Sequence, residues 1–401
     1  GYDPVVITRR WDADVERLKE VNQASAPDKE IVEAEGYTVH YLPYRSSWRD
    51  QLLEKYGPDR FRILRKALSF KQLLAQNFFL SASEVSNFYT EAHQLIQSNP
   101  DIRQVIVSAK PFSLFFVAWK LQIEFPHIQW VADYRDTWNA SEIDERKGLM
   151  QSILGKLEAA SEKKWLQTAS LVTSVSPHYV DQLKTYLKHP NVQLLLNGFW
   201  EQETEPLPVP AHQFVLTYNG SLYPSQEIDT FLEGFKQFVD RHSDQLPIRL
   251  QFPGVGFLPD QEARLRQRMQ GYEKYLFSSP RLPRQQVLEM QQQSDILLMF
   301  RHGQLKGIPS SKLYEYLGLR KPVLLCPPDG DIIEETLKET GLGLFANSAE
   351  ACCAVLENRL QQKMQTGSVS VGVRENSLQQ YSRRAQAQKL ARYLDALQGK
   401  P

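Results

Sequence analysis

Residues 301–326 (RHGQLKGIPSSKLYEYLGLRKPVLLC) combine the cations and turn residues from which anion-binding sites are built. Pro309 stands where a helix would begin, since the fixed φ of proline suits the first helical turn. The backbone amides of Ser310 and Ser311 would then point outward at the positive end of the helix dipole. The sequence therefore predicts a phosphate-binding helix start.

Charged side chains flank this expected helix start. Arg301, Lys306 and Lys312 supply three cations, and Glu315 falls one turn after Ser311 on the same helix face. A carboxylate there can accept hydrogen bonds from sugar hydroxyls, as acidic residues do with ribose in dinucleotide sites. Alternatively, Lys312 and Glu315 form an ordinary surface pair beside a solvated loop. Spacing alone leaves both interpretations open.

Strand-like runs alternate with helical stretches along the chain, a pattern typical of parallel α/β sheets. Strands are expected at 5–8, 37–42, 104–108, 128–133, 171–174, 192–196, 214–219, 248–252, 296–300, 322–326 and 343–345. Residues 201–210 (EQETEPLPVP) are too stiff and polar for a packed element and mark a domain boundary. We therefore expect two doubly wound domains, 1–203 and 204–375, facing a central cleft. A last segment, 376–401, contains one long helix over 377–397 that packs back across the domains.

The composition excludes several classes of protein. Lys plus Arg number 47 and Asp plus Glu number 47, so no overall charge attracts nucleic acid. Hydrophobic residues make up 42% of the 401 residues, which is far from the composition of a disordered chain. The most apolar uncharged stretch, 111–119, is well short of the roughly 20 residues of a transmembrane helix. We expect a folded protein without membrane spans or nucleic-acid partners.

The cysteines indicate the compartment. Cys326 and the adjacent Cys352 and Cys353 cannot form a disulfide framework, and no Cys or His cluster has metal-ligand spacing. We therefore expect a reducing, cytoplasmic location and no bound metal. No signal peptide precedes the strand-like start. Residues 1–8 look like the second strand of a domain, so we expect the sequence to start inside its first domain.

A basic segment begins at Arg60 and ends at Ser83 (RFRILRKALSFKQLLAQNFFLSAS), with five basic residues and no acidic ones. Such a stretch can lie on an anionic bilayer at the inner face of the membrane or line a lipid-linked acceptor site. The alternative is a core-packed helix with a solvated basic face, because apolar residues at helical spacing usually form core. The sequence leaves a peripheral membrane contact as one of two possibilities.

Residues 308–324 (IPSSKLYEYLGLRKPVL) resemble the donor-site signature of glycosyltransferase family 4, retaining enzymes of the GT-B fold that use nucleotide sugars. Further similarities lie at 133–138 (DYRDTW), an Arg-Asp-x-Trp motif, at 175–198, and at 218–222 (YNGSL). The resemblance covers most of the chain and is weakest before residue 100. It implies two Rossmann-like domains with a nucleotide diphosphate sugar as substrate, without a cofactor or a metal.

The resemblance also implies roles for individual residues. The implied catalytic residues are Arg135, Arg301, Lys306 and Lys312. The implied donor-binding residues are Gly220, Ser221, Gly307, Ile308, Pro309, Ser310, Ser311, Leu313 and Glu315, with Asp136 and His302 as further candidates. The implied reaction transfers a hexose to a hydroxyl of a saccharide or lipid-linked saccharide, with retention, in cell-surface polysaccharide or glycolipid synthesis.

The sequence departs from the family pattern at four positions. Gly307 stands in place of the first of two donor-site glutamates eight positions apart, and only Glu315 is retained. Ser221 and Gln226 replace an Arg and a Lys that often contact the diphosphate, so the cations at 301–312 would compensate. Arg135 stands where many members have a His, which suggests contact with the diphosphate or donor sugar.

Other functions remain open on the sequence alone. The absence of several donor-site residues of the family is consistent with a catalytically silent GT-B scaffold or binding protein. A nucleotide-sugar epimerase of the same fold is the other alternative, and it would need carboxylates or His for proton transfer. Arg135 and Asp136, expected at the end of a strand, either face the cleft or form an ion pair that holds a loop.

Overall fold

The computed structural model describes residues 2–9, 28–43, 47–57, 60–78, 84–139, 149–201 and 207–399. The chain divides into two compact units. Among the described residues, unit 1 contains 2–9, 28–195 and 392–399, and unit 2 contains 196–391. The sequence-predicted boundary at residue 203 lies outside the described residues.

Unit 2 is built on a six-stranded sheet in the order β10-β9-β8-β11-β12-β13. Each neighbouring pair of these strands is parallel. The strands are β8 (Phe214–Thr217), β9 (Ile248–Pro253), β10 (Leu276–Ser279), β11 (Ile296–Met299), β12 (Val323–Leu325) and β13 (Gly343–Phe345). Parallel strands of this kind need helices on the sheet faces to cover them.

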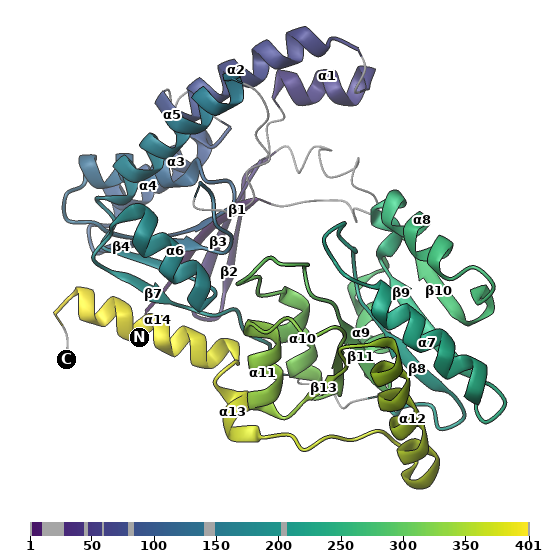
Figure 1. The fold of residues 1–401 in the computed structure, drawn as a ribbon. Coiled ribbons are helices and arrows are strands. Elements are labelled where there is room, and N and C mark those ends of the chain that lie inside the picture. The colour runs from purple at the N-terminus through teal and green to yellow at the C-terminus, as the bar shows by residue number, and fades with distance from the viewer. Residues whose placement is uncertain are drawn as a thin grey trace. The chain divides into compact units, whose positions relative to one another are not determined.

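Helices cover both faces of the unit 2 sheet. Along β11, Ile296 and Leu298 join one apolar cluster, which includes α7 (Asp229–His242) and α12 (Ala349–Thr366), whereas Leu297 and Met299 join another. The second cluster includes α10 (Ser311–Leu319) and α11 (Ile332–Thr340). Figure 1 shows these two helices on one side of the sheet and α7 and α12 on the other. This alternation follows from the two-residue period of a strand and makes unit 2 doubly wound.

Shorter elements complete unit 2. They are η3 (Val255–Phe257), α8 (Pro259–Arg268), η4 (Glu273–Tyr275), α9 (Arg284–Gln292) and α13 (Glu375–Gln379). Ser382 and Phe199 form a backbone bridge near the end of the unit. The helix expected over 377–397 is therefore divided: α13 ends at Gln379 and a second helix, α14, runs over Arg383–Leu397.

Unit 1 contains a four-stranded parallel sheet in the order β4-β5-β6-β7. Its strands are β4 (Gln104–Ala109), β5 (Gln129–Tyr134), β6 (Leu171–Ser174) and β7 (Val192–Leu194). The helices of the unit are α1 (Trp48–Tyr56), α2 (Arg62–Phe78), α3 (Ser86–Ser98), α4 (Leu114–Glu124), α5 (Leu149–Leu166) and α6 (Pro177–Leu187). One apolar cluster joins α4, β5, α5 and α6, with Trp130 and Phe115 fully buried in it.

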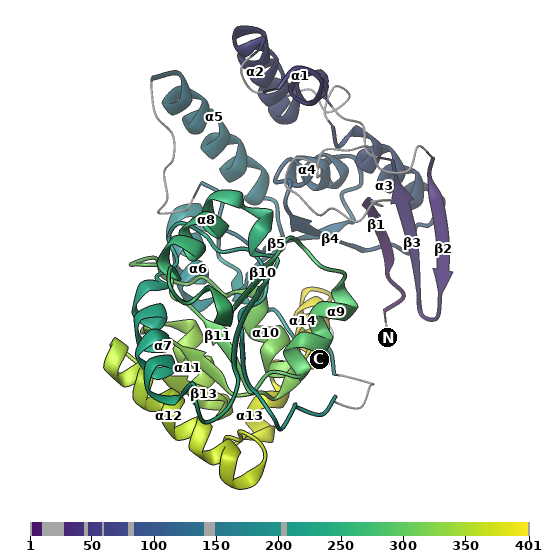
Figure 2. The same cartoon turned by 90° about the vertical axis from the view of Figure 1, so that its right-hand side faces the viewer.

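A second, three-stranded sheet of unit 1 has the order β1-β3-β2 (Figure 2). β1 (Val5–Arg9) is parallel to β3 (Tyr37–Leu42), and β2 (Glu30–Ala34) forms an antiparallel hairpin with β3. Gly36 has a φ of 82° in the hairpin turn, a conformation that glycine adopts without strain. The sequence pattern predicted only parallel strands here, so the hairpin corrects that expectation.

The last turns of α14 belong to unit 1. Gln104 and Gln129, each the first residue of a strand, donate hydrogen bonds to the backbone oxygens of Leu394 (3.0 Å) and Leu397 (2.8 Å). The Tyr393 hydroxyl donates to the Leu194 oxygen over 3.2 Å. The last turns of α14 are thus attached to the amino ends of β4 and β5 and to the carboxyl end of β7. Among the helices of the described residues, none is both long and apolar enough to cross a membrane.

Candidate functional site

The strand order of unit 2 identifies where a ligand would bind. Chain connections run outward in opposite directions from β8 and β11, which are neighbours in the sheet. Open α/β sheets bind ligands outside the carboxyl ends of the strands at such a switch point. The segments that follow these two strands are the turn at Tyr218–Gly220 and the loop that leads into α10.

The start of α10 leaves backbone donors without acceptors. The helix begins at Ser311, two residues after the Pro309 start that the sequence predicts, and its N-cap residue Ser310 makes no side-chain capping hydrogen bond. The Leu313 amide donates to the Ser310 oxygen over 3.0 Å. Among the described residues, the amides of Ser311 and Lys312 have no hydrogen-bond acceptor, as expected for a first helical turn. Free amides at a helix start are the kind of donor that binds anions in proteins.

The ammonium group of Lys312 lies beside this helix start and against the turn after β8. A Cβ atom on Gly220 would lie 3.6 Å from the Lys312 Nζ atom and 3.1 Å from its Cε atom. The ammonium also lies 5.3 Å from the ring centroid of Tyr218. Desolvation lowers the pKa of Lys312 to about 8, although the charge of Glu315 raises it. Within the described part of the chain, Lys312 has no hydrogen-bond or ion-pair partner.

Glu315 is held one turn further along α10. Asn219, from the turn after β8, donates its Nδ2 hydrogen to the Glu315 carboxylate over 3.4 Å. The Asn219 backbone amide donates to the hydroxyl oxygen of Tyr316, which is fully buried, over 3.0 Å. Two consecutive residues of α10 therefore bind the same asparagine, so the helix start, the ammonium and the carboxylate share one edge of the sheet.

Two of the predicted cations are occupied by other groups. Arg301 follows β11 and forms an ion pair with Glu227 in which its Nη2 lies 2.7 Å from the carboxylate. The exposed Lys306 donates to the backbone oxygen of Asp329 over 2.7 Å. We expected three cations to share the anion site, and the structure gives only Lys312 an ammonium that is not already neutralised or hydrogen-bonded.

A carboxylate that the sequence did not indicate lies next to this loop. Asp331, the N-cap residue of α11, accepts a hydrogen bond from the Gly307 amide. Gly307 is buried and has a φ of 71°. Asp331 and Glu227 are 24 and 74 residues from their partners, so no local sequence signal links either carboxylate to this loop.

His302 is neutral at physiological pH. Burial, and then the charge of Lys312, lower its pKa to about 4. Its Nδ1 atom lies 2.9 Å from the Ser225 hydroxyl, and its ring packs against Tyr223. An imidazole in this state can accept or donate one hydrogen bond but adds no positive charge to the site.

The remaining donor-site candidates are turn and core residues. Ile308 and Pro309 are partly buried before the helix, and Leu313 is fully buried in the cluster beneath it. The backbone oxygen of Ser221 accepts a hydrogen bond from Tyr218. Gln226 is buried, and its side-chain oxygen accepts a hydrogen bond from the Tyr223 amide over 2.9 Å. Gln226 therefore stabilises the turn.

Arg135 and Asp136 follow β5 in unit 1. Arg135 pairs with Asp133, the Nε to Oδ2 distance being 2.7 Å. Asp136 pairs instead with Lys110 over 3.2 Å, and both side chains are exposed. The expected alternative, an ion pair between Arg135 and Asp136, is wrong. Arg135 pairs with Asp133, which lies two positions earlier, and Asp136 pairs with Lys110.

A buried carboxylate supports this same loop. Glu162 on α5 is fully buried and accepts hydrogen bonds from the hydroxyls of Tyr134 (2.7 Å) and Tyr186 (3.1 Å) and from Asn139 Nδ2 (2.7 Å). Burial raises the pKa of Glu162. Because Tyr134 and Asn139 flank residues 135–138, Glu162 fixes both ends of the loop that carries Arg135.

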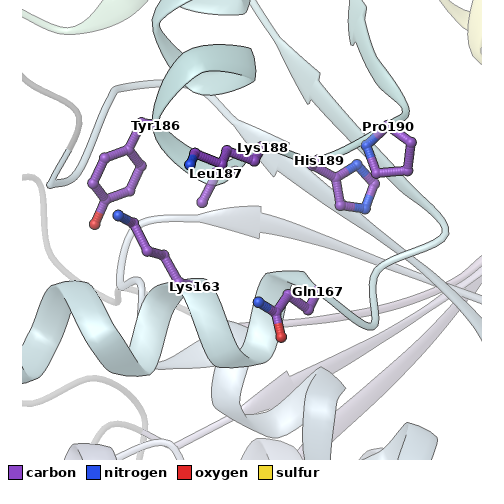
Figure 3. Close-up of a pocket in the computed structure, with 7 residues that line it drawn as sticks. All are labelled: Lys163, Gln167, Tyr186, Leu187, Lys188, His189 and Pro190. Carbon is purple, nitrogen blue, oxygen red and sulfur yellow. The ribbon is translucent and has the colours of Figure 1, made fainter.

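A pocket of about 350 Å³ lies elsewhere in unit 1, between the ends of α5 and α6 (Figure 3). Its Lys163 ammonium lies 4.4 Å from the Tyr186 ring centroid. Both ring nitrogens of His189 lie within 3.1 Å of backbone oxygens. The Tyr186 hydroxyl and the His189 ring thus already have protein partners, and the pocket includes none of the sequence-predicted site residues. Over the described residues, no group of three His, Cys, Asp or Glu side chains could hold a metal ion.

The fold is that of solved GT-B glycosyltransferases. A sucrose-phosphate synthase from Thermosynechococcus elongatus aligns with 100% of this chain and 90% of its own, at 15% identity and a TM-score of 0.61. A UDP-forming trehalose-phosphate synthase from Burkholderia vietnamiensis covers 98% of both chains, at 9% identity and a TM-score of 0.57. Anabaena HepE in complex with UDP-glucose covers 82% of this chain and 89% of its own, at 13% identity and a TM-score of 0.53.

This likeness shows the fold alone, since the identities are low. The chain has the GT-B fold. No family model matches it, and no curated protein matches its sequence. The sequence-predicted fold class, mixed α/β with parallel sheets in two Rossmann-like units, is confirmed.

Proposed function

We propose that the protein is a retaining glycosyltransferase that moves a hexose from a nucleotide diphosphate sugar to a hydroxyl acceptor. The observation that carries the proposal is the start of α10, where the free amides of Ser311 and Lys312 and the Lys312 ammonium meet at the sheet's switch point. A diphosphate supplies the negatively charged oxygens that these amides and this ammonium can bind. The UDP and UDP-glucose complexes of structurally similar HepE support the same class of donor.

The chemistry follows from where charge develops. The bond between the anomeric carbon and the diphosphate oxygen breaks, and the acceptor oxygen forms the new bond on the same face of the sugar. The acceptor's proton passes to the leaving diphosphate. Fixed amides and the Lys312 cation, aimed at the diphosphate, stabilise its growing charge and so lower the barrier. Glu315 binds donor hydroxyls and takes no proton.

The other proposed roles follow from the family resemblance. Arg135 in unit 1 contacts the diphosphate or the donor sugar, and the acceptor is a saccharide or a lipid-linked saccharide. The protein acts in the cytoplasm, in the synthesis of a cell-surface polysaccharide or glycolipid. Arg301 and Lys306 stabilise the loop before α10 through their bonds to Glu227 and Asp329, which is a smaller role than direct contact with phosphate.

Calorimetric titration with UDP, GDP and their hexose derivatives tests the proposal. We expect saturable binding of at least one nucleotide, and Lys312→Ala and Glu315→Ala should each weaken donor use by more than tenfold. Lys321, just after the other end of α10, is a matched control, because its pKa is also lowered to about 8 by burial. Lys321→Ala should leave nucleotide affinity unchanged.

The outcomes separate the enzyme from its alternatives. Nucleotide binding without sugar transfer to any acceptor would favour a silent GT-B binding protein. The ion pair of Arg301 with Glu227 and the hydrogen bond of Lys306 to a backbone oxygen already favour that alternative. Binding followed by inversion of a sugar hydroxyl would favour an epimerase. If no nucleotide binds, the site assignment at α10 fails.

A further inference from the structure

The outer faces of α1 and α2 in unit 1 expose large apolar side chains. Ile63 on α2 is 85% exposed and Trp48 on α1 is 77% exposed. Leu64 and Phe70 on α2 are also exposed, as is Phe61 just before it. The core-packed helix that the sequence allowed is therefore wrong for the described side chains of α2. Several large apolar residues gathered on two neighbouring helices mark an interaction surface.

The spacing along α2 places these residues on one helix face. Ile63, Ala67 and Phe70 are four and three residues apart, so they form a single stripe. Arg62 and Lys66, four residues apart, form a parallel row on one side of this stripe. An apolar stripe beside a basic row is the pattern of a helix that lies in a membrane interface.

The charge of the segment is of one sign. Arg60, Arg62, Lys66 and Lys71 are exposed, and residues 60–83 contain no acidic residue. The whole protein is neutral, so this cationic segment contrasts with the rest of the chain. The sequence-predicted segment extends to Ser83, but residues 79–83 and the side chains of 72–78 lie outside the described parts of the structure.

Exposed aromatic residues also lie on α1, the neighbour of α2. The exposed Trp48 and Tyr56 lie on α1, and Tyr56 packs edge-on against Phe61 with ring centroids 5.0 Å apart. Trp and Tyr favour the boundary between lipid headgroups and acyl chains, where one end of the ring is apolar and the other is wet. Aromatic, aliphatic and basic groups thus occur together on this helix pair.

We infer that α1 and α2 dock the protein on the surface of an anionic phospholipid bilayer. Ile63 and Phe70 enter the boundary between headgroups and acyl chains, and Arg62 and Lys66 face lipid phosphates. A free phosphate ligand would leave the apolar stripe exposed, whereas a bilayer accommodates the stripe and the cations together. This inference does not depend on the proposed glycosyl transfer.

Vesicle flotation with the full chain tests the inference. At low salt we expect binding to phosphatidylglycerol-containing vesicles at least tenfold tighter than to pure phosphatidylcholine, and weaker binding at high salt. Ile63→Glu should reduce binding by more than tenfold. Arg62→Ser and Lys66→Ser should each reduce it about fivefold.

Matched variants control for charge and apolar exposure. Ile123, about half exposed on α4, should tolerate replacement by Glu without loss of vesicle binding. Lys184 and Lys188, also four residues apart and exposed, should tolerate replacement by Ser in the same way. Nucleotide affinity should be unchanged in all these variants.

Three results would overturn the inference. The first is an absence of binding to anionic vesicles at low salt, and the second is an Ile63→Glu variant that binds them as tightly as the original chain. The third is a concentration-dependent dimer of the original chain that the Ile63→Glu substitution dissociates, together with no binding of the original chain to vesicles. That last result would assign the same surface to a second copy of the protein.

Discussion

Two helices of unit 2, α10 and α12, carry the same kinds of polar group in opposite states. Ser348 caps α12 by accepting a hydrogen bond from the Ala351 amide over 3.2 Å. Lys363, near the other end of α12, lies 2.7 Å from both carboxylate oxygens of Asp295. In α10, neither Ser310 nor Lys312 has the equivalent contact. The α12 groups stabilise the fold, and the α10 groups are available to a ligand.

The largest predicted effect concerns Lys363. Its side chain is 1% exposed, and it also donates to the backbone oxygens of Pro210 and Gln213. Lys363→Met leaves the Asp295 carboxylate buried without its partner, which ordinarily costs about 3–5 kcal/mol. We expect a loss of this size in the free energy of unfolding, measured by urea denaturation. A loss below about 1 kcal/mol would contradict the interpretation of α12.

Lys312→Met should have the opposite effect on stability. Folding lowers the pKa of Lys312 from 10.5 to about 8. Below pH 8 the side chain is charged in both states, and its charge costs more free energy in the folded state than in the unfolded chain. The unfolded chain binds more protons between pH 8 and 10.5, and stability contributed by this group therefore rises with pH in that window. Removing the charge should leave the free energy of unfolding at pH 7 unchanged or higher, by at most roughly 3 kcal/mol.

The binding readout separates this variant from Lys363→Met. Lys312→Met should weaken nucleotide binding more than tenfold at pH 7, whereas the folded fraction of Lys363→Met should keep its affinity. A Lys312→Met protein that loses stability as Lys363→Met does would show that Lys312 is a structural residue and not a ligand-binding one.

Donor affinity should also depend on pH. With a pKa of about 8, roughly nine in ten Lys312 side chains are charged at pH 7 and one in ten at pH 9. We expect UDP-hexose affinity to fall about tenfold over this range, measured by calorimetry. Lys312→Met should remove the dependence. His302 should contribute nothing above pH 5, because its pKa is lowered to about 4.

A helix or strand can be predicted from the sequence when neighbouring residues alone determine it. All the expected strands follow local patterns of apolar residues and are confirmed. The start of α10, predicted at Pro309 from proline and serine, lies two residues later at Ser311. β2 and β10 were missed, because a short strand with exposed or partly buried side chains has no distinctive apolar run.

The electrostatic state of the site could not be predicted in this way. Arg301, Lys306 and Lys312 are equivalent as a pattern of charges, and only the fold brings Glu227 to the first and the Asp329 carbonyl to the second. These contacts join different loops at the carboxyl edge of one sheet. Sequence spacing therefore locates the helix start, while sheet topology decides which cation is left for a ligand.

The smallest predicted effect compares the two helix caps. Ser348→Ala removes the hydrogen bond to the Ala351 amide and should cost about 1 kcal/mol of unfolding free energy. Ser310→Ala removes no capping bond and should change stability by only a few tenths of a kcal/mol. Paired urea denaturation curves measure both effects. Equal losses would mean that Ser310 caps α10 in solution, and the free amides would then be unavailable to a diphosphate.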